Sequence, residues 1–404
     1  MTKDCKKLLL LGGSEFQIPF IKEAKQQGIH VGIIDINENA TAKKFADEFF
    51  VCSVKDCESV LEIAKKFHPD GVSVGMIDIA VPSCAYIASK LGLPGLDIQT
   101  SINSTNKFEM VKCFEKSNVP HPKYEYVPYE SFKDKKTTTV GYPAIVKPID
   151  MAGSRGIFLV HNNEELRWAL DQCSEIGDSG NLLIEEYMVG PEVSVELVVK
   201  NGIPHVIQIT DKSTTGPPHF AEIGHLQPSQ LPEKTLEQVG KVACDAAVSL
   251  GLYNSLGHAE IIITSDGPKM VEIGARAGGD AIGEQLVLLS TGVNFPKIAL
   301  QIAFGEEISD YVPHRQHAAC IRFIKSKEGQ LKGIIGIEAA RSLPGIAEIS
   351  ISGVIGQKYH DVVDNSGRLG HIISIGNTPE DAALACESAL KEIKIDYMEV
   401  QNNE

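Results

Sequence analysis

One stretch, residues 257–279 (GHAEIIITSDGPKMVEIGARAGG), constrains this chain more than any other. It predicts two apolar strands joined by a turn, with one carboxylate in each strand, Glu260 and Glu272. A three-residue loop over residues 265–267 puts these glutamates directly opposite each other, whereas a two-residue loop over 266–267 puts them on opposite faces. Facing carboxylates repel each other unless a cation lies between them, and Mg²⁺ prefers oxygen ligands of this kind. The alternative interpretation is a hairpin with two surface glutamates.

Arg276 follows the second strand and is itself followed by Gly278 and Gly279. A planar guanidinium beside a metal site suits a carboxylate or a phosphate. In the facing register Gly274 lies opposite His258, and the sequence leaves open whether this histidine contacts a substrate or is a packed strand residue.

The composition limits the classes of protein to which this chain can belong. A length of 404 residues predicts two or three domains. The formal net charge of −15 argues against a nucleic-acid or anionic-membrane partner. The nine cysteines never occur as CxxC, so we expect neither a disulfide framework nor a zinc site, and a cytoplasmic location. The apolar run near the N-terminus is too short for a signal peptide, and no later run reaches membrane-spanning length.

The first hundred residues alternate short apolar strands with amphipathic helices, starting with KKLLLL and HVGIID. This alternation predicts a doubly wound α/β domain. The turn GGSEF lacks the GxGxxG spacing, so it is read either as a small-anion site at a helix N-terminus or as a tight turn.

A second strand-rich region begins at residue 142 with YPAIVKP, in which Lys147 is embedded among apolar residues. The turn that follows contains Gly153, Ser154 and Gly156, and such turns present backbone N–H groups to phosphate oxygens. It is not a P-loop, because its lysine precedes the loop. A strand lysine that reaches solvent along its own stem is the alternative.

Further candidates lie between residues 185 and 225. Glu185 and Glu186 end one predicted strand, and Tyr187 and Met188 lie at the break after it. The second strand carries Glu192, suited to a ribose hydroxyl, and Glu196, read as solvated or structural. A Gly/Pro-rich loop over residues 211–231 contains Glu222 and His225, either functional or simply surface residues. From about residue 314 the chain is strand-rich, ends in a helix and shows no recognisable chemistry.

The order of these motifs resembles the ATP-grasp superfamily over nearly the whole chain. The motifs are NK at 106–107, IVKP at 145–148, AGSRGI at 152–157, EEYMVGPEVSVE at 185–196, HAE at 258–260 and VEIGARAGG at 271–279. Within the superfamily the chain is most similar to the carboxylate–amine ligases that join amino acids. The resemblance implies an α/β fold with a Rossmann-like N-terminal domain (1–103), an ATP-grasp domain (104–310, with a lid near 123–190 and a large metal-binding part) and a strand-rich C-terminal subdomain (311–404).

The resemblance also implies roles for individual residues. ATP would be bound by Lys107, Lys147, Gly153, Ser154, Gly156, Glu185, Glu186, Tyr187, Met188 and Glu192. Mg²⁺, expected as two ions with Mn²⁺ as a substitute, would be bound by Glu260, Glu272 and Glu222. Arg276 and Lys147 would be catalytic, and Arg276, Gly278, Gly279, His225 and His258 would contact the substrate. Many members have Asn where this chain has Gly274, which removes one oxygen ligand.

The implied activity is the ATP-dependent joining of a small-molecule carboxylate to an amine through an acyl phosphate, with release of ADP and phosphate. The alternatives are a purine-pathway ribonucleotide ligase, a biotin-carboxylase-like enzyme and a non-catalytic ATP-binding sensor. A homodimer is the default expectation for the assembly. The sequence does not identify the acid or the amine.

Overall fold

The computed structural model describes residues 5–151, 153 and 155–398 of the chain. These residues form two compact units, each assembled from separate stretches of sequence. Unit 1 comprises Met1–Pro122, Ser194–Ile209 and Glu233–His314, and unit 2 comprises Lys123–Val193, Thr210–Pro232 and Arg315–Glu404. Because the units interleave along the chain, the linear domain boundaries given above stay predictions.

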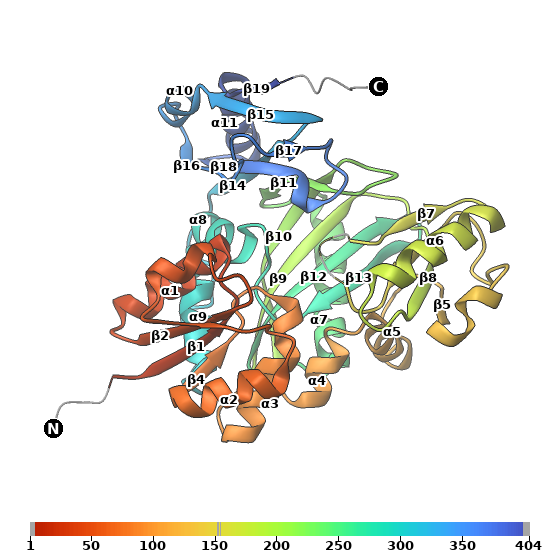
Figure 1. Ribbon diagram of the computed structural model, residues 1–404, viewed down its shortest axis with the longest axis horizontal. Coiled ribbons are helices and arrows are strands. Elements are labelled where there is room, and N and C mark those ends of the chain that lie inside the picture. Colours follow the sequence, from red (N-terminus) through yellow and green to blue (C-terminus); the bar gives the residue numbers. More distant parts are fainter. Residues whose placement is uncertain (1–4, 152, 154, 399–404) are drawn as a thin grey trace. The chain divides into compact units, whose positions relative to one another are not determined.

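Unit 1 begins with the predicted parallel α/β layer (Figure 1). Its strands, in the order β3-β2-β1-β4, are β1 (Lys7–Leu11), β2 (His30–Asp35), β3 (Glu48–Val51) and β4 (Gly71–Ser73). The helices are α1 (Ile18–Gln26), α2 (Cys57–Phe67) and α3 (Val81–Leu91), followed by α4 (Ile98–Asn103) and α5 (Lys107–Lys116). Helix α1 buries Phe20, Ile21 and Ala24 on one face, as expected for an amphipathic helix that covers a sheet.

The rest of unit 1 is a second sheet with its own helices. The strands follow the order β13-β12-β9-β10: β13 (Gly267–Gly274), β12 (Ser255–Thr264), β9 (Glu192–Lys200) and β10 (Ile203–Thr214). The helices are α7 (Glu233–Leu250), α8 (Val287–Thr291) and α9 (Phe295–Ala303), with a π-helix, η5, at Ile282–Leu286. One buried cluster joins side chains of β1 and β2 to those of α9, so both layers share a core.

Unit 2 contains a small antiparallel sheet in the order β5-β8-β6-β7, beside which α6 (Asn163–Ile176) packs. Its strands are β5 (Tyr124–Val127), β6 (Ala144–Pro148), β7 (Phe158–Val160) and β8 (Leu182–Glu186). The buried side chains of α6, Leu166, Ala169, Leu170 and Cys173, have helical spacing and fill the core of this sheet.

The remaining part of unit 2 contains the C-terminal residues. The end of β10 pairs with β11 (Glu222–Gln227), and the order continues through β14 (Ala318–Lys325), β18 (Arg368–Gly376) and β16 (Ile346–Ile351). A three-stranded sheet has the order β17-β15-β19, with β15 (Gly329–Ile335), β17 (Lys358–Tyr359) and β19 (Lys394–Met398). The helices are α10 (Ile337–Arg341) and α11 (Pro379–Glu392).

Strand β11 corrects one expectation. The Gly/Pro-rich loop predicted over residues 211–231 contains a regular strand, which pairs antiparallel with β10 on one side and with β14 on the other. The pairing with β14 joins residues almost a hundred positions apart, and such a partner cannot be read from local composition.

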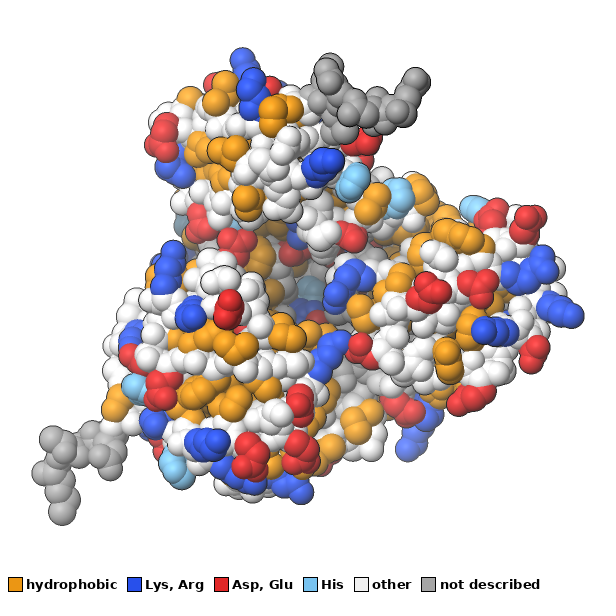
Figure 2. Space-filling view, viewed as in Figure 1, with side chains coloured by type: hydrophobic (Ala, Val, Ile, Leu, Met, Phe, Trp, Pro, Cys, Tyr) orange, Lys and Arg blue, Asp and Glu red, His pale blue; other side chains and the backbone are white. Residues whose placement is uncertain are grey.

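Two surface features bear on possible partners. In the view of Figure 2, Lys and Arg side chains are interspersed with Asp and Glu, and no extended patch of one sign is visible on that face. Among the helices of residues 5–398 that the structure describes, none is long and apolar enough to cross a bilayer.

Candidate functional site

The hairpin of β12 and β13 brings Glu260 opposite Glu272 and His258 opposite Gly274, as the facing register predicts. The turn that leads to this register is shorter than the expected three-residue loop. The turn contains only Ser265 and Asp266, because Thr264 pairs with Gly267. The pairing then shifts by one residue between Ile261 and Glu260, which leaves Val271 as a bulge in β13. A shorter turn and a bulge therefore give the same pairing as a longer turn.

Lys107 neutralises one of these two carboxylates. Its Nζ atom lies 2.7 Å from Oε2 of Glu272. Asn106 caps α5 by accepting hydrogen bonds from the backbone N–H groups of Phe108 and Glu109, and this fixes Lys107 as the first helical residue. Burial by itself would lower the pKa of Lys107, but the attraction of Glu272 outweighs it and the pKa is raised. Lys107 therefore carries a positive charge at neutral pH and lies beside the paired carboxylates.

His258 connects Glu260 to a second, deeper carboxylate. The Nδ1 atom of His258 bonds Oε1 of Glu196, and its Nε2 atom lies 3.5 Å from Oε1 of Glu260. Burial opposes the charge on this histidine, but Glu196 and then Glu260 favour it and raise the pKa to about 9. His258 is thus an imidazolium at neutral pH, held between two carboxylates. Because the ring of His258 is buried, this geometry lets His258 position the carboxylate of Glu260.

Glu196 is fully buried, so the solvated reading of this residue is wrong. Besides His258, it accepts a hydrogen bond of 3.0 Å from the backbone N–H of Gly278. A Cβ atom at position 278 would lie 2.5 Å from Oε1 of Glu196 and 2.7 Å from Nδ1 of His258. Glycine is therefore required at 278 for the backbone to approach this pair. At Gly279 the nearest atom to such a Cβ would be Cε of Met76, at 3.2 Å.

A buried carboxyl group follows this glycine pair. Glu284 lies in the π-helix η5 and is 2% exposed. Burial raises its pKa well above the ordinary value, and the negative charges of Asp280 and Glu196 raise it further. The residue is therefore neutral well above the pH at which a surface glutamate ionises.

Arg276 directs its guanidinium toward Asp78, a residue from the loop after β4. Its Nη2 atom donates to Oδ2 of Asp78 at 2.5 Å, and Nη1 donates to the backbone carbonyl of Ala277 at 2.9 Å. Burial disfavours the charged guanidinium, but Asp78 outweighs this effect and raises the pKa of Arg276. The side chain is only 9% exposed, so the ion pair is largely shielded from water.

Three predicted nucleotide residues of unit 2, Lys147, Glu185 and Glu186, lie on strands of the small sheet. The Nζ atom of Lys147 on β6 lies 2.6 Å from Oε2 of Glu185 on β8, and both residues are buried. The lysine therefore does not reach solvent along its stem, which excludes that alternative. Gly153 and Gly156 have φ angles of +70° and +74°, which glycine adopts without strain, and Ser154 lies outside the described residues.

The chain leaves the sheet after Glu186, at the predicted break. The backbone N–H of Tyr187 donates to the carbonyl of Pro143 at 3.3 Å, and the N–H of Glu186 donates to the carbonyl of Lys123 at 2.9 Å. Met188 lies just beyond, outside any strand. A segment held by its backbone in this way suits the predicted adenine contacts through main-chain groups, and that role stays a prediction.

Glu222 and Glu192, predicted to hold a metal ion and a ribose respectively, share one lysine. The Nζ atom of Lys212 lies 2.8 Å from Oε1 of Glu192 and 2.7 Å from Oε1 of Glu222. The guanidinium of Arg368 lies 3.4 Å from Oε2 of Glu222 and also donates to its backbone carbonyl. Within unit 2, therefore, two cations already neutralise the Glu222 carboxylate.

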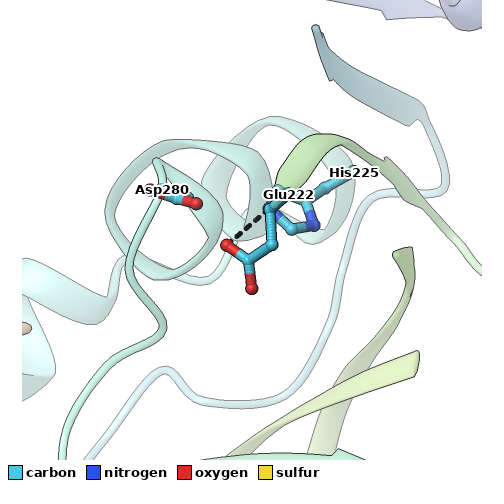
Figure 3. Close-up of side chains that lie close together, drawn as sticks. All are labelled: Glu222, His225 and Asp280. Atoms are coloured by element: carbon cyan, nitrogen blue, oxygen red, sulfur yellow. Dashed lines mark ion pairs between the residues drawn. The ribbon is translucent and has the colours of Figure 1, made fainter. Parts of the chain in front are cut away.

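His225 lies on the same strand as Glu222 and is fully buried (Figure 3). Its Nε2 atom lies 4.0 Å from Oε2 of Glu222, and its ring packs edge-on against Phe323 at 6.1 Å between centroids. The surface-loop reading of this residue is therefore wrong, and its predicted contact with a substrate stays a prediction.

Several residues around the site escaped the sequence analysis. Asp78 and Arg368 lie far along the chain from their partners Arg276 and Glu222, in segments without a motif. Lys212 lies in the segment 211–231, which was predicted to be a loop. The C-terminal region is therefore not without chemistry, because Arg368 reaches the candidate ligand Glu222. No sequence signal pointed to Lys212 either, because residues 210–214 (TDKST), which end β10, are all polar.

Comparison with known proteins adds family information to this geometry. A family model described as an ATP-grasp domain matches residues 140–284, and one described as L-amino acid ligase C-terminal domain 2 matches residues 322–398. The crystal structure of L-amino acid ligase from Bacillus licheniformis superimposes with a TM-score of 0.86 at 24% identity, covering 98% of this chain and 100% of that one. At this identity the likeness establishes the fold.

Two curated relatives give further context. The formate-dependent phosphoribosylglycinamide formyltransferase of Prochlorococcus marinus (strain NATL1A) is 25% identical over 351 residues, which cover 83% of this chain and 86% of that protein. The uncharacterized protein y4rH of Sinorhizobium fredii is 25% identical over 313 residues and 76% of this chain. The match spans 64% of the length of y4rH.

Proposed function

We propose that the chain is an ATP-dependent ligase of the ATP-grasp superfamily that joins a small carboxylate to an amine. The observation that carries the proposal is the match of residues 322–398 to the C-terminal domain of L-amino acid ligases, together with the structural likeness to such a ligase over 98% of the chain. The ATP-grasp domain itself is shared with enzymes of other specificity, so the C-terminal match is the more selective of the two.

The reaction needs activation, because a carboxylate oxygen is a poor leaving group. In the proposed sequence a carboxylate oxygen of the acid attacks the γ-phosphorus of ATP, and ADP leaves. The amine nitrogen then attacks the carbonyl carbon of the acyl phosphate, the bond from carbon to phosphate oxygen breaks, and phosphate leaves. One proton is lost from the nitrogen, which yields the amide. The developing negative charge must be balanced in both steps.

Residues of unit 1 fit the charge that this reaction develops. Glu260 and Glu272 face each other on neighbouring strands with side chains 15% and 23% exposed, so their oxygens are accessible to a divalent cation such as Mg²⁺. When bound, Mg²⁺ supplies positive charge that offsets charge on phosphate oxygens. Lys107 and Arg276 are cations at the same end of the hairpin, and Arg276 is the residue proposed to hold the acyl phosphate.

Residues of unit 2 fit the recognition of a nucleotide. Lys147 is a buried strand lysine whose partner Glu185 keeps it in a fixed place, and Gly153 and Gly156 give the adjoining turn the conformational freedom to close on phosphates. We propose that Glu192 holds the ribose and that residues 185–188 contact adenine.

A second candidate function is a ribonucleotide ligase of purine synthesis. The relative from Prochlorococcus marinus favours it, because its name gives a phosphoribosylglycinamide substrate and the match covers 86% of its length. Such an enzyme also activates a carboxylate, so the two candidates differ in the acceptor of the acyl group.

One experiment separates the candidates. The full chain is incubated with ATP, Mg²⁺ and pairs drawn from a panel of amino acids and small acids; the nucleotide product is identified and amides are detected by mass spectrometry. ADP formation only when acid and amine are both present supports the ligase. ADP formation that requires a ribonucleotide as the acceptor of the acyl group moves the assignment to the second candidate. Formation of AMP contradicts the acyl-phosphate sequence, and ATP binding without turnover supports a sensor.

A further inference from the structure

The guanidinium of Arg276 is only partly satisfied by the protein. Its Nη1 and Nη2 atoms donate to Ala277 and Asp78, but its Nε atom is buried and has no hydrogen-bond partner among the described residues. A buried N–H without an acceptor is unfavourable, because the group has lost its hydrogen bond to water. The unused donor therefore marks a place where an acceptor oxygen would be favourable.

The unused donor belongs to the edge of the guanidinium that binds oxyanions. Nε and Nη2 lie on one side of the planar group, and two parallel hydrogen bonds from such an edge are the usual way in which arginine holds a carboxylate or a phosphate. Asp78 bonds only Nη2 of this edge. An internal carboxylate thus occupies half of the edge that the proposed substrate would need.

The absence of a side chain at Gly274 makes this occupation possible. A Cβ atom there would lie 2.5 Å from Oδ1 of Asp78 and 3.2 Å from Nε of Arg276. The φ angle of Gly274 does not lie in the left-handed region, so the backbone does not require glycine. What glycine provides at this position is space for the carboxylate of Asp78.

Asp78 is placed where it can leave Arg276. It begins the short 3-10 helix Asp78–Ala80 after β4, and its side chain is 21% exposed, compared with 9% for Arg276. Lys107 is a second cation that attracts it, since Asp78 contributes to the raised pKa of Lys107. A released Asp78 carboxylate therefore has both access to solvent and another positive charge nearby.

We propose that Asp78 is a specificity-determining residue, which fills the oxyanion edge of Arg276 until a substrate carboxylate or acyl phosphate takes its place. The proposal rests on the role given to Arg276 in the proposed ligase reaction. Its consequence is that an oxyanion bonded to both Nε and Nη2 must displace an internal carboxylate, whereas a singly bonded anion gains only the contact with Nε.

The test measures binding of inorganic phosphate to the full chain by calorimetry, without nucleotide or Mg²⁺. Asp78→Ala removes the competing carboxylate, and we expect about tenfold tighter phosphate binding, the effect of losing one charged hydrogen bond. Gly274→Ala changes no charge but forces Oδ1 of Asp78 away, and we expect a gain in the same direction. The double variant should gain little over either single variant, because both act on one contact.

Two further variants control the measurement. Glu237→Gln removes one negative charge from the exposed face of α7, and it should change phosphate affinity less than threefold. Arg276→Ala reports phosphate bound elsewhere, which is subtracted. Thermal melting of each variant shows whether it is folded.

The outcomes are distinct. Unchanged or weaker phosphate binding in Asp78→Ala overturns the proposal and makes Asp78 a residue that merely positions Arg276. An equal gain in Glu237→Gln overturns it too, because net charge alone would then explain the effect. Phosphate binding that survives fully in Arg276→Ala shows that the edge is no oxyanion site. Failure of the ligase assay does not affect this test, which involves no turnover.

Discussion

The carboxylate of Glu196 is bonded to Nδ1 of His258 in the interior of unit 1, where both residues are at most 4% exposed. Neither residue can reach bulk water, yet the pair extends through Nε2 of His258 to Glu260, 3.5 Å away. A buried charge pair of this kind orients the outer carboxylate, much as a second carboxylate orients a histidine that binds a metal ion. It also makes stability depend on pH.

The pKa of His258, raised to about 9, predicts a loss of stability at alkaline pH. The unfolded value is about 6.5, so the contribution is fully present below that pH and is lost as the pH rises through about 9. The shift corresponds to roughly 3 kcal/mol. The free energy of unfolding in urea, measured at pH 6 and at pH 10, should fall by about this amount more in the wild type than in His258→Gln. The exposed His161→Gln serves as control, and equal falls in all three proteins would refute the assignment.

The buried carboxyl group of Glu284 predicts that the protein loses stability when this group ionises. Burial raises its folded pKa, so the folded protein loses stability as the pH rises above the unfolded value near 4.5. Glu284→Gln should therefore raise the melting temperature at pH 7.5, and the gain should vanish at pH 4. Glu237→Gln, on the exposed face of α7, should change the melting temperature at neither pH. A neutral or destabilising effect of Glu284→Gln at pH 7.5 would show that the carboxylate is satisfied when charged.

Glu272→Gln tests the metal assignment. The change removes one of the two facing carboxylates while keeping the shape of the side chain, and we expect Mg²⁺-dependent turnover to fall by about 10²–10³-fold, as for loss of a well-placed charge. The melting temperature should fall as well, because Lys107 loses its counterion, so turnover is measured at a temperature where the variant is folded. Asp266→Asn, in the turn of the same hairpin and 77% exposed, is the matched control and should keep full activity. Normal turnover in Glu272→Gln would show that Glu272 does not bind the metal ion.

Variants of the buried pair Lys147–Glu185 test separately its effect on stability and its role in turnover. Glu185→Gln leaves a buried lysine without its counterion, which typically costs about 3–5 kcal/mol of folding free energy. Glu186→Gln, one residue further along the chain and less buried, should cost far less. The double variant Lys147→Met/Glu185→Leu should recover stability but not turnover. Recovered turnover in that variant would show that Lys147 does not contact the nucleotide.

The hairpin shows how much the sequence could predict. The three-residue loop over 265–267 predicted the pairing of Glu260 with Glu272 that the structure shows, but the apolar pattern by itself left the second register open. The turn length was predicted wrongly, since a bulge and a longer turn leave the same pairing. Local patterns do not distinguish these two solutions.

The parts that could not be predicted all depend on distant partners. Strand β11 is stabilised by β14, and Glu196 is buried because the backbone of Gly278 and the ring of His258 cover it. Asp78 was overlooked because its role depends on Arg276, almost two hundred residues further on. In each case the sequence contained the residue, but only the folded chain supplies the neighbour that gives it a role.

The bulge at Val271 has a consequence for comparing sequences. Between the turn and the bulge the two strands are paired in one frame, and beyond it they are paired in another, shifted by one. Val271 is therefore the residue whose deletion would leave the partners of Glu260 and His258 unchanged. When a homologue has a hairpin one residue shorter, the gap in the alignment belongs at Val271. Placing it in the turn would leave Glu260 and Glu272 aligned but would shift residues 267–270, the partners of residues 261–264, by one position.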